Sequence, residues 1–128
     1  MKIRKYRKED EDKVMEIIEQ EGEQWRDYFA PENQAMYRKA LEQSVTYIAL
    51  ENGMVCGFSR SLDDHACSIF VCDLLVTAKF RGKDVGKQLM ECLCDDYPSK
   101  TIYAMSDVDE YYEKQGYKNI GSIFLINI

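Results

Sequence analysis

The first part of the chain combines a strand pattern with a helix pattern. Residues Ile3–Tyr6 alternate apolar and charged side chains, which predicts a short first strand. The acidic stretch Lys8–Asp12 then favours a helix start, because carboxylates suit the positive end of a helix dipole. The helix is expected to end at Gly22. Its apolar positions at helical spacing are Val14, Ile17 and Ile18.

A second helix is predicted over Glu32–Gln43, after a short aromatic segment. We expect its inner face to carry Ala35, Met36, Ala40 and Leu41. Along the chain, two predicted helices therefore separate the first strand from the remaining strands of the sheet.

Three strand patterns follow in the middle of the chain. Val45–Leu50 is rich in β-branched and aromatic residues, and Asn52-Gly53 is a typical two-residue hairpin turn. Met54–Ser59 is expected to pair back, and a second turn at Asp63–His65 leads to a longer strand over Cys67–Val76. The pattern predicts three consecutive antiparallel strands.

The last part of the chain is predicted to form a helix, a strand, a short helix and a final strand or strands. The apolar stripe of the first of these helices is Val85, Leu89, Met90 and Leu93. Thr101–Met105 is expected to run parallel to the preceding strand, as in other strand–helix–strand units. A short helix over residues 108–115 should end at Gly116, before strands within Tyr117–Asn127. Residues 1–128 are thus expected to form one α/β domain: a mixed, mostly antiparallel sheet with helices on both faces.

Charge and hydropathy argue against two classes of partner. The net charge of −6 and the pI of about 4.8 disfavour nucleic acid, which requires a basic face. No apolar run approaches the roughly 18–20 residues that cross a bilayer, and the N-terminus lacks the apolar segment of a signal peptide. We predict a cytoplasmic protein that binds neither nucleic acid nor membrane. An acidic field suits a cationic partner such as an amine, although it equally promotes solubility alone.

The five cysteines and single histidine do not have the spacing of a metal site. No C-x-x-C pair occurs and His65 stands alone in a turn, whereas zinc requires about four suitably spaced ligands. We expect no metal, and cysteines that are reduced and mostly buried. Cys72 has no histidine near it in sequence to act as its base, so we expect a packed strand residue.

The most informative local feature is a glycine loop, residues 79–86, between a strand that ends at Val76 and a helix. Backbone N–H groups at a helix N-terminus bind anions, and glycine lets the backbone approach a phosphate closely. Arg81, Lys83 and Lys87 add three cations. The pattern indicates a pyrophosphate site, but it has neither P-loop nor dinucleotide-fold spacing.

The glycine loop resembles the acyl-CoA-binding motif of the GCN5-related N-acetyltransferase (GNAT) family, R/Q-x-x-G-x-G/A after a strand ending in L-x-V. Arg81, Gly82 and Gly86 match this motif, and Leu74–Val76 fits the strand end. The family usually has glycine where this chain has Asp84. A carboxylate there repels phosphate and could cap the helix, although aspartate tolerates a left-handed backbone.

Two further segments strengthen the resemblance. Val108–Tyr117 resembles the family's C-terminal motif, aromatic-Tyr-Glu-Lys-x-Gly-aromatic, and Val55–Phe58 resembles its V-x-G-F hairpin strand. The three ordered matches cover most of residues 45–120, whereas the N-terminal helices match in order and size only.

The resemblance implies an acyl-CoA N-acyltransferase-like fold that transfers an acetyl (acyl) group from acetyl-CoA to a primary amine of a small molecule or peptide. Tyr112 matches the tyrosine that protonates the CoA sulfur as general acid, unless it packs against the sheet as its neighbours do. Asp73 is the candidate base, directly or through water, unless it is a solvated or salt-bridged strand residue. The implied cofactor-binding residues are Leu74, Leu75, Val76, Arg81, Gly82, Lys83, Asp84, Val85, Gly86 and Lys87.

Three points stay open at this level. The aromatic and acidic segment between the first two helices either lines the acceptor site or belongs to the core; its residues are Glu23, Trp25, Tyr28 and Phe29. The protein could be a monomer or a homodimer. It could also be a CoA-binding regulatory module without turnover, or a partner-binding domain that binds no CoA.

Overall fold

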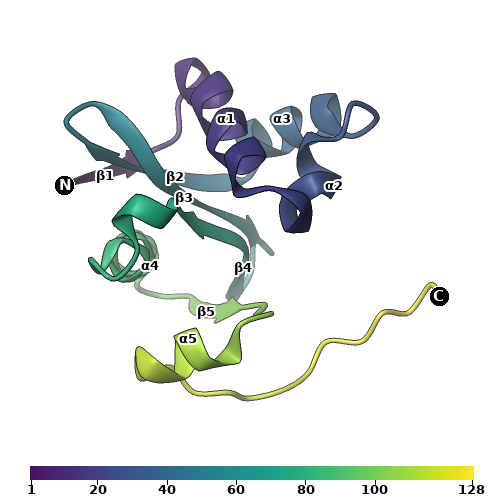
Figure 1. Cartoon of the computed structure of the whole chain (residues 1–128). Helices are drawn as coiled ribbons and strands as arrows, with labels where there is room; N and C mark the ends of the chain where they lie inside the picture. The colour runs from purple at the N-terminus through teal and green to yellow at the C-terminus, as the bar shows by residue number, and fades with distance from the viewer.

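The computed structural model describes residues 1–128 and contains one five-stranded sheet in the order β1-β2-β3-β4-β5 (Figure 1). The strands are β1 (Lys2–Lys5), β2 (Val45–Glu51), β3 (Met54–Asp63), β4 (Ser68–Val76) and β5 (Thr101–Ala104). Pairing is antiparallel from β1 to β4, and β5 runs parallel to β4. The three antiparallel strands and the parallel crossover predicted from the sequence are confirmed.

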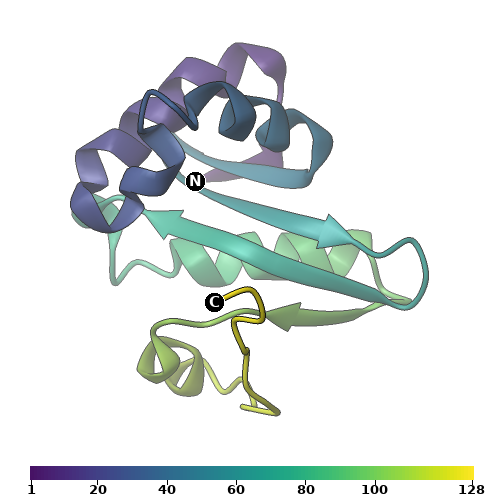
Figure 2. The same cartoon turned by 90° about the vertical axis from the view of Figure 1, so that its right-hand side faces the viewer.

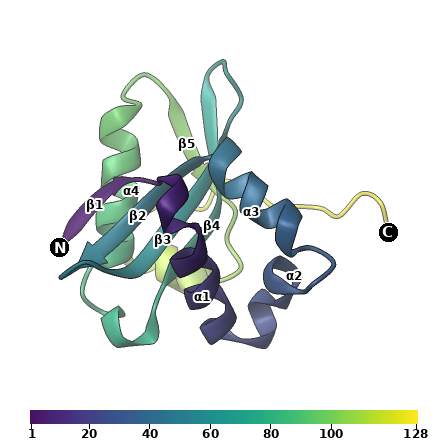
Figure 3. The same cartoon turned by 90° about the horizontal axis from the view of Figure 1, so that it is seen from above.

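Helices lie on both faces of this sheet, which confirms the predicted fold class. They are α1 (Glu11–Glu21), α2 (Arg26–Phe29), α3 (Gln34–Gln43), α4 (Val85–Asp96) and α5 (Asp109–Lys114). The views in Figures 2 and 3 place α1 and α3 over one face and α4 on the other. Neighbouring residues of β2 accordingly enter different cores, Ile48 under α1 and Tyr47 under α4. None of these helices combines the length and the hydropathy that a bilayer-spanning segment needs.

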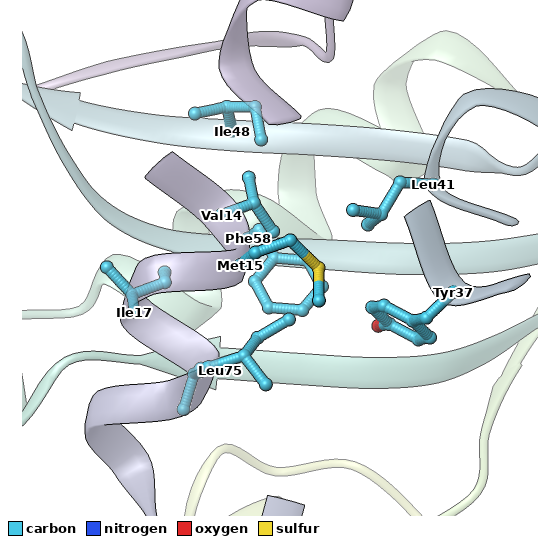
Figure 4. Packing of buried hydrophobic residues seen from close by; sticks show 9 residues of the cluster. Val14, Met15, Ile17, Tyr37, Leu41, Ile48, Phe58 and Leu75 are labelled. Atoms are coloured by element: carbon cyan, nitrogen blue, oxygen red, sulfur yellow. The ribbon is translucent and has the colours of Figure 1, made fainter. Parts of the chain in front are cut away.

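The first core lies between α1, α3 and the sheet, as Figure 4 shows. Its buried members are Val14, Met15, Ile17, Ile18, Tyr37, Leu41, Ile48, Phe58 and Leu75. The predicted inner face of α3 was wrong in part, because Met36 is 69% exposed and Ala35 is exposed too. Leu41 faces inward as predicted, and Tyr37, one helical turn before it, takes the inward position in place of Ala35 and Met36. Tyr37 buries its ring because its hydroxyl finds an acceptor in Asp73 on β4.

The second core lies under α4, and all four residues of the apolar stripe predicted for that helix are buried. They pack against β2, β3 and β4. The Asn52-Gly53 turn is also confirmed, since φ is 51° at Asn52 and 78° at Gly53, as a tight hairpin turn requires. The second turn contains His65, which also has positive φ.

The C-terminal part differs from the rest, because no residue beyond Leu93 is buried. The predicted strands within Tyr117–Asn127 were wrong, because residues 117–128, the C-terminal tail, form no strand and do not join the sheet. The expectation of mostly buried cysteines was also wrong. Although all five are free thiols, Cys56 alone is buried.

Candidate functional site

A cleft opens where β4 and β5 separate. The two strands are paired from Ser68 and Thr101 as far as Val71 and Ala104, but β4 continues to Val76. The pairing of β3 with β4 also skips Cys72, which marks a bulge at the point of separation. The backbone of β4 beyond this bulge therefore lacks a strand partner on the β5 side and is available to a ligand.

The cleft has a volume of about 970 Å³. Its walls come from β4, the glycine loop, the start of α4, the segment from β5 through α5, and the end of α1 with α2. Of the site residues expected from the sequence, the cleft is lined by Asp73, Leu74, Leu75, Val76, Arg81, Gly82, Asp84, Val85, Gly86 and Tyr112. The structure thus brings together ten residues from three separate segments.

Two expected cofactor residues do not line the cleft. The Lys83 ammonium lies 5.4 Å from the centre of the Phe80 ring, and the Lys87 ammonium lies 3.9 Å from a Glu91 carboxylate oxygen. Both lysines are exposed. They add positive charge beside the cleft, and Arg81 is the cation that lines it.

The glycine loop turns into α4 through two left-handed residues. Gly82 has φ of 76°, and Asp84, which immediately precedes the helix, has φ of 62° and ψ of 19°. The aspartate therefore preserves the backbone that a glycine would adopt there. Its side chain makes no capping hydrogen bond, so the first N–H groups of α4 are not occupied by its carboxylate.

Arg81 connects the glycine loop to the N-terminal helices. Its Nε donates a hydrogen bond to the Val76 carbonyl oxygen at 3.0 Å, and its Nη2 forms an ion pair with Glu21 at the end of α1. Glu21 also lines the cleft. Sequence reasoning missed this carboxylate because the pair joins positions 60 residues apart.

Gly86 is a close-packing site between α4 and α5. A Cβ atom at this position would overlap the Tyr111 hydroxyl and lie 3.7 Å from Leu74 Cδ2. Burial raises the pKa of Tyr111, and the nearby Asp84 carboxylate raises it further. The Tyr111 side chain therefore lies at the start of α4, beside the glycine loop.

Tyr112 also projects from α5 and lines the cleft. Burial is the main cause that raises its pKa to about 12, with smaller contributions from Tyr111, Asp107 and Tyr117. Its ring meets the Tyr111 ring edge-on at 5.1 Å. The hydroxyl is therefore protonated at neutral pH.

Asp73 is ion-paired and 4% exposed. Its Oδ2 accepts hydrogen bonds from Arg60 Nε at 2.6 Å and from the Tyr37 hydroxyl at 2.8 Å. Arg60 also donates to the Ser44 hydroxyl at 3.2 Å. The structure therefore shows the salt-bridged alternative for this strand residue, although Asp73 still lines the cleft.

The aromatic segment contributes to both the cleft and the core. Trp25 and Tyr28 line the cleft, whereas Glu23 and Phe29 do not. Trp25 also packs edge-on against Phe58 at 6.2 Å. Burial raises the pKa of Tyr28 to about 12, with a further increase from the Asp73 carboxylate.

Sequence reasoning missed much of the remaining wall. The segment that follows β5 contributes Met105, Ser106, Asp107 and Val108, and the wall also includes Gln24, Cys72, Phe80, Tyr111, Gln115 and Ile123. A signal for the first four was available, because loops after the C-terminal ends of parallel strands commonly form sites.

The separating parallel strands above a glycine loop define an acyl-CoA N-acyltransferase-like fold. Residues 42–119, more than half of the chain, match the family described as "Acetyltransferase (GNAT) domain". The chain belongs to the GNAT acetyltransferase family, as its motifs predicted.

Solved structures share this fold over nearly the whole chain. A GNAT family acetyltransferase from Streptococcus pneumoniae TIGR4 has a TM-score of 0.76 at 21% identity, covering 99% of this chain and 98% of that one. A ribosomal-protein-alanine N-acetyltransferase from Brucella melitensis biovar Abortus 2308 has a TM-score of 0.76 at 17% identity, covering 100% and 99%. Aminoglycoside N-acetyltransferase AAC(6')-Iy in complex with CoA has a TM-score of 0.74 at 14% identity, covering 99% and 98%.

A curated relative, histone acetyltransferase TAP1 from Glycine max, is 32% identical over 73 residues. The alignment covers 53% of this chain and 32% of that protein, so the chain spans about a third of the relative's length.

Proposed function

We propose that the protein transfers an acetyl group from acetyl-CoA to a primary amine of a small molecule or peptide, and that it does so in the cytoplasm. The observation that carries this proposal is the cleft itself. One cleft contains unpaired strand backbone, the N-terminus of α4 and a protonated tyrosine, which are the groups that acyl transfer from a thioester requires.

The residues of the cleft fit CoA in chemistry. The unpaired backbone of Leu74–Val76 offers hydrogen bonds to the amide groups of pantetheine. The free N–H groups at the start of α4, with Gly82 and Arg81, suit the pyrophosphate. When bound, acetyl-CoA supplies the activated acetyl group and a thiol leaving group.

Tyr112 is the proposed general acid. It lines the cleft and its hydroxyl holds its proton at neutral pH, and this hydroxyl would donate that proton to the thiolate as the sulfur leaves. A backbone N–H of Leu74–Val76 would donate to the thioester carbonyl oxygen and stabilise negative charge there.

Asp73 is the proposed base, acting directly or through water. Its Oδ2 accepts hydrogen bonds from Tyr37 and Arg60, and its carboxylate faces the cleft beside Tyr28. The ion pair with Arg60 stabilises the charged form of this carboxylate. An amine that loses its proton before it binds would need no base from the protein.

The proposed acceptor wall is formed by Trp25 and Tyr28, with Glu21 and Asp73 nearby. The aromatic faces favour a cationic group such as an alkylammonium ion. The printed names of the relatives include aminoglycoside, ribosomal-protein-alanine and histone acetyltransferases. They support an amine acceptor in general and do not select one size class for this chain.

A second candidate is a CoA-binding module without turnover. Two observations favour it: Glu21 occupies Arg81 in an ion pair, and the Asp84 carboxylate lies beside the proposed pyrophosphate site. Both place negative charge where a phosphate would bind.

Two measurements test the proposal in sequence. CoA should raise the thermal midpoint of the wild-type protein, because a ligand that binds only the native state stabilises it. Thiol release from acetyl-CoA should then appear with at least one member of an amine panel. No shift with CoA would refute the proposal, and a shift without thiol release would favour the second candidate.

The role of Tyr112 is tested by removing its hydroxyl. Tyr112→Phe should lower kcat by about 10²-fold while the CoA-induced thermal shift persists. The matched control is Tyr117→Phe, in which a 40% exposed tyrosine close to α5 is changed in the same way and activity should persist. Equal activity in the two variants would show that the Tyr112 hydroxyl is not the general acid and that the side chain serves packing.

A further inference from the structure

Glu21 is a carboxylate of the cleft wall to which the proposed reaction assigns no step. It is the last residue of α1, its side chain is 13% exposed, and its one ion-pair partner is Arg81. A carboxylate at the C-terminal end of a helix faces the negative end of the helix dipole, and the last turn of α1 contains no basic residue to compensate it. The charge of Glu21 is therefore balanced by Arg81 alone.

The two members of this ion pair differ in how firmly they are held. Glu21 belongs to a helix whose Ile17 and Ile18 are buried in the first core. Arg81 projects from the glycine loop, and its side chain is 51% exposed. Its Nε donates to the Val76 carbonyl oxygen at 3.0 Å, whereas its Nη2 end reaches Glu21. If the pair separates, the arginine is the partner that moves.

Coenzyme A would compete with Glu21 for this arginine. Arg81 and its neighbour Gly82 line the cleft beside the start of α4, whose free N–H groups suit the pyrophosphate. A guanidinium group binds phosphate with two parallel hydrogen bonds, which makes phosphate a strong competitor for it. No other cation lines the cleft, so an Arg81 that binds the pyrophosphate leaves Glu21 as a shielded carboxylate without a counterion. Such a charge is unfavourable until another cation pairs with it.

The surroundings of this carboxylate suit a cation that comes from the acceptor. Trp25 and Tyr28 line the same cleft, and aromatic faces attract ammonium groups. Through its ion pair, Glu21 lies near the Val76 end of β4, whereas the proposed base Asp73 lies three residues earlier, about 10 Å along a strand. Glu21 is thus too far from Asp73 to hold the amine that reacts, and it would hold a second cationic group.

We propose that Glu21 recognises a second cationic group of the acceptor, and that it becomes available only when CoA binds Arg81 in its place. The inference rests on the proposed function, because it takes CoA as the ligand of the glycine loop. It narrows the acceptor to amines with a second positive charge about 10 Å from the reactive nitrogen, as in a linear diamine. By thermodynamic linkage, a cation that binds Glu21 strengthens the binding of CoA in return.

Calorimetry with CoA and octamethylenediamine measures this coupling without requiring turnover. CoA should tighten the binding of the diamine to the wild-type protein by about tenfold, a coupling of ordinary size for two linked sites. The amino alcohol of the same length carries one charge fewer and should show little coupling. Equal coupling for the two ligands, or no coupling for the diamine, overturns the proposal.

Glu21→Gln removes the charge and keeps the shape of the side chain. This variant should bind CoA several-fold more tightly than wild type, because its Arg81 is free, and CoA should no longer tighten the diamine. Glu19→Gln is the matched control, because it removes the same charge from an exposed position in the same turn of α1, outside the cleft. Coupling that survives Glu21→Gln, or that is lost equally in Glu19→Gln, overturns the proposal.

Arg81→Gln provides the converse test, since it frees Glu21 without CoA. The diamine should bind this variant alone about as tightly as it binds the wild-type complex with CoA, and binding as weak as in the wild-type apo protein overturns the proposal. A wild-type protein that binds no CoA would refute both this inference and the proposed function. Coupling without thiol release would refute acetyl transfer alone, whereas thiol release without coupling would refute the role of Glu21 alone.

Discussion

Residues 1–93 form two buried cores, whereas residues 94–128 contain no buried residue. All 26 buried residues lie in the first region, where α1, α3 and α4 cover the two faces of β1–β4. The second region contains β5, α5 and the tail, and its rings are half-buried or exposed. The cleft lies on the boundary between them.

Because the two regions differ in packing, we expect the two sides of the cleft to contribute differently to the site. The glycine loop and β4 belong to the well-packed region, which suits the precise backbone contacts that a bound phosphate or amide needs. Tyr112 belongs to the lightly packed region, whose local opening costs less free energy than global unfolding. We therefore expect α5 to move relative to the glycine loop more readily than the glycine loop moves relative to the cores.

The largest expected effect tests the packing contrast directly. Phe58→Ala removes a ring that is 0% exposed, and it should lower the free energy of unfolding by about 3–5 kcal/mol. Val108→Ala, at a side chain that is 57% exposed, should change it by less than about 0.5 kcal/mol. Urea denaturation of both variants provides the measurement, and losses of similar size would contradict the comparison.

A buried ion pair gives the next largest effect. Asp10 is 4% exposed and accepts two hydrogen bonds from Arg4, at 2.7 and 2.8 Å, and one from the Arg7 N–H. Asp10→Asn should lower the free energy of unfolding by about 1.5–3 kcal/mol, the range for hydrogen bonds to a charged group. Asp95→Asn, at an exposed carboxylate, is the control and should be nearly neutral.

The same carboxyl group should make stability depend on pH. Arg4 holds the pKa of Asp10 below its ordinary value of 3.8. Because the folded-state pKa is lowered, the stabilisation is complete above that ordinary value and is lost as the pH falls through the folded-state pKa. Wild-type stability should therefore fall more steeply than that of Asp10→Asn in this acidic range, and parallel curves would contradict the assignment.

The contact between Gly86 and Tyr111 tests how strongly the two regions are coupled. Gly86→Ala should lower the free energy of unfolding by about 1–3 kcal/mol, because the new methyl group overlaps the Tyr111 hydroxyl. Tyr111→Phe removes that hydroxyl and should restore much of the loss in the double variant. A double-mutant cycle measures the coupling, and strictly additive losses would show that α5 simply moves aside.

The smallest expected effect concerns Asp84. Asp84→Gly should stabilise the apo protein slightly, by about 0.5–1 kcal/mol, because glycine adopts positive φ without strain. It should also tighten CoA several-fold by removing a charge that costs about 1 kcal/mol near phosphate. Asp84→Asn keeps a side chain that tolerates this backbone, so it isolates the charge. Calorimetry at low and moderate salt should show the gain shrinking as salt rises, whereas no gain at low salt would exclude the repulsion.

The sequence predicted the features that depend only on residues close together in the chain. The apolar stripe of α4 and the Asn52-Gly53 turn depend on spacing and backbone chemistry within a few residues, and both were confirmed. The inward position of Tyr37 on α3 was not predictable from hydropathy, because its hydroxyl is held by an acceptor on a distant strand. The tail has a strand pattern but no partner within the chain, and a strand requires one.

In the candidate site too, local motifs were predictable and contacts between distant segments were not. The glycine loop and Tyr112 could be placed from local motifs, whereas the Glu21–Arg81 pair depends on tertiary contact. A usable signal existed for the Arg60–Asp73 pair, because each is the charged residue within an otherwise uncharged stretch of β3 or β4. Their positions directly across the two strands depend on the bulge at Cys72, because the unshifted hairpin register would place Arg60 opposite Cys72.

Trp25, the only tryptophan in the chain, gives this cleft a built-in optical probe. Its indole is half-buried in the cleft wall and lies 5.4 Å from the Tyr28 ring. A ligand that enters the cleft changes the polarity around this indole, so the emission maximum and its accessibility to a soluble quencher should change on binding. Light that excites indole but not phenol would report on the cleft alone, without a label and without interference from the nine tyrosines.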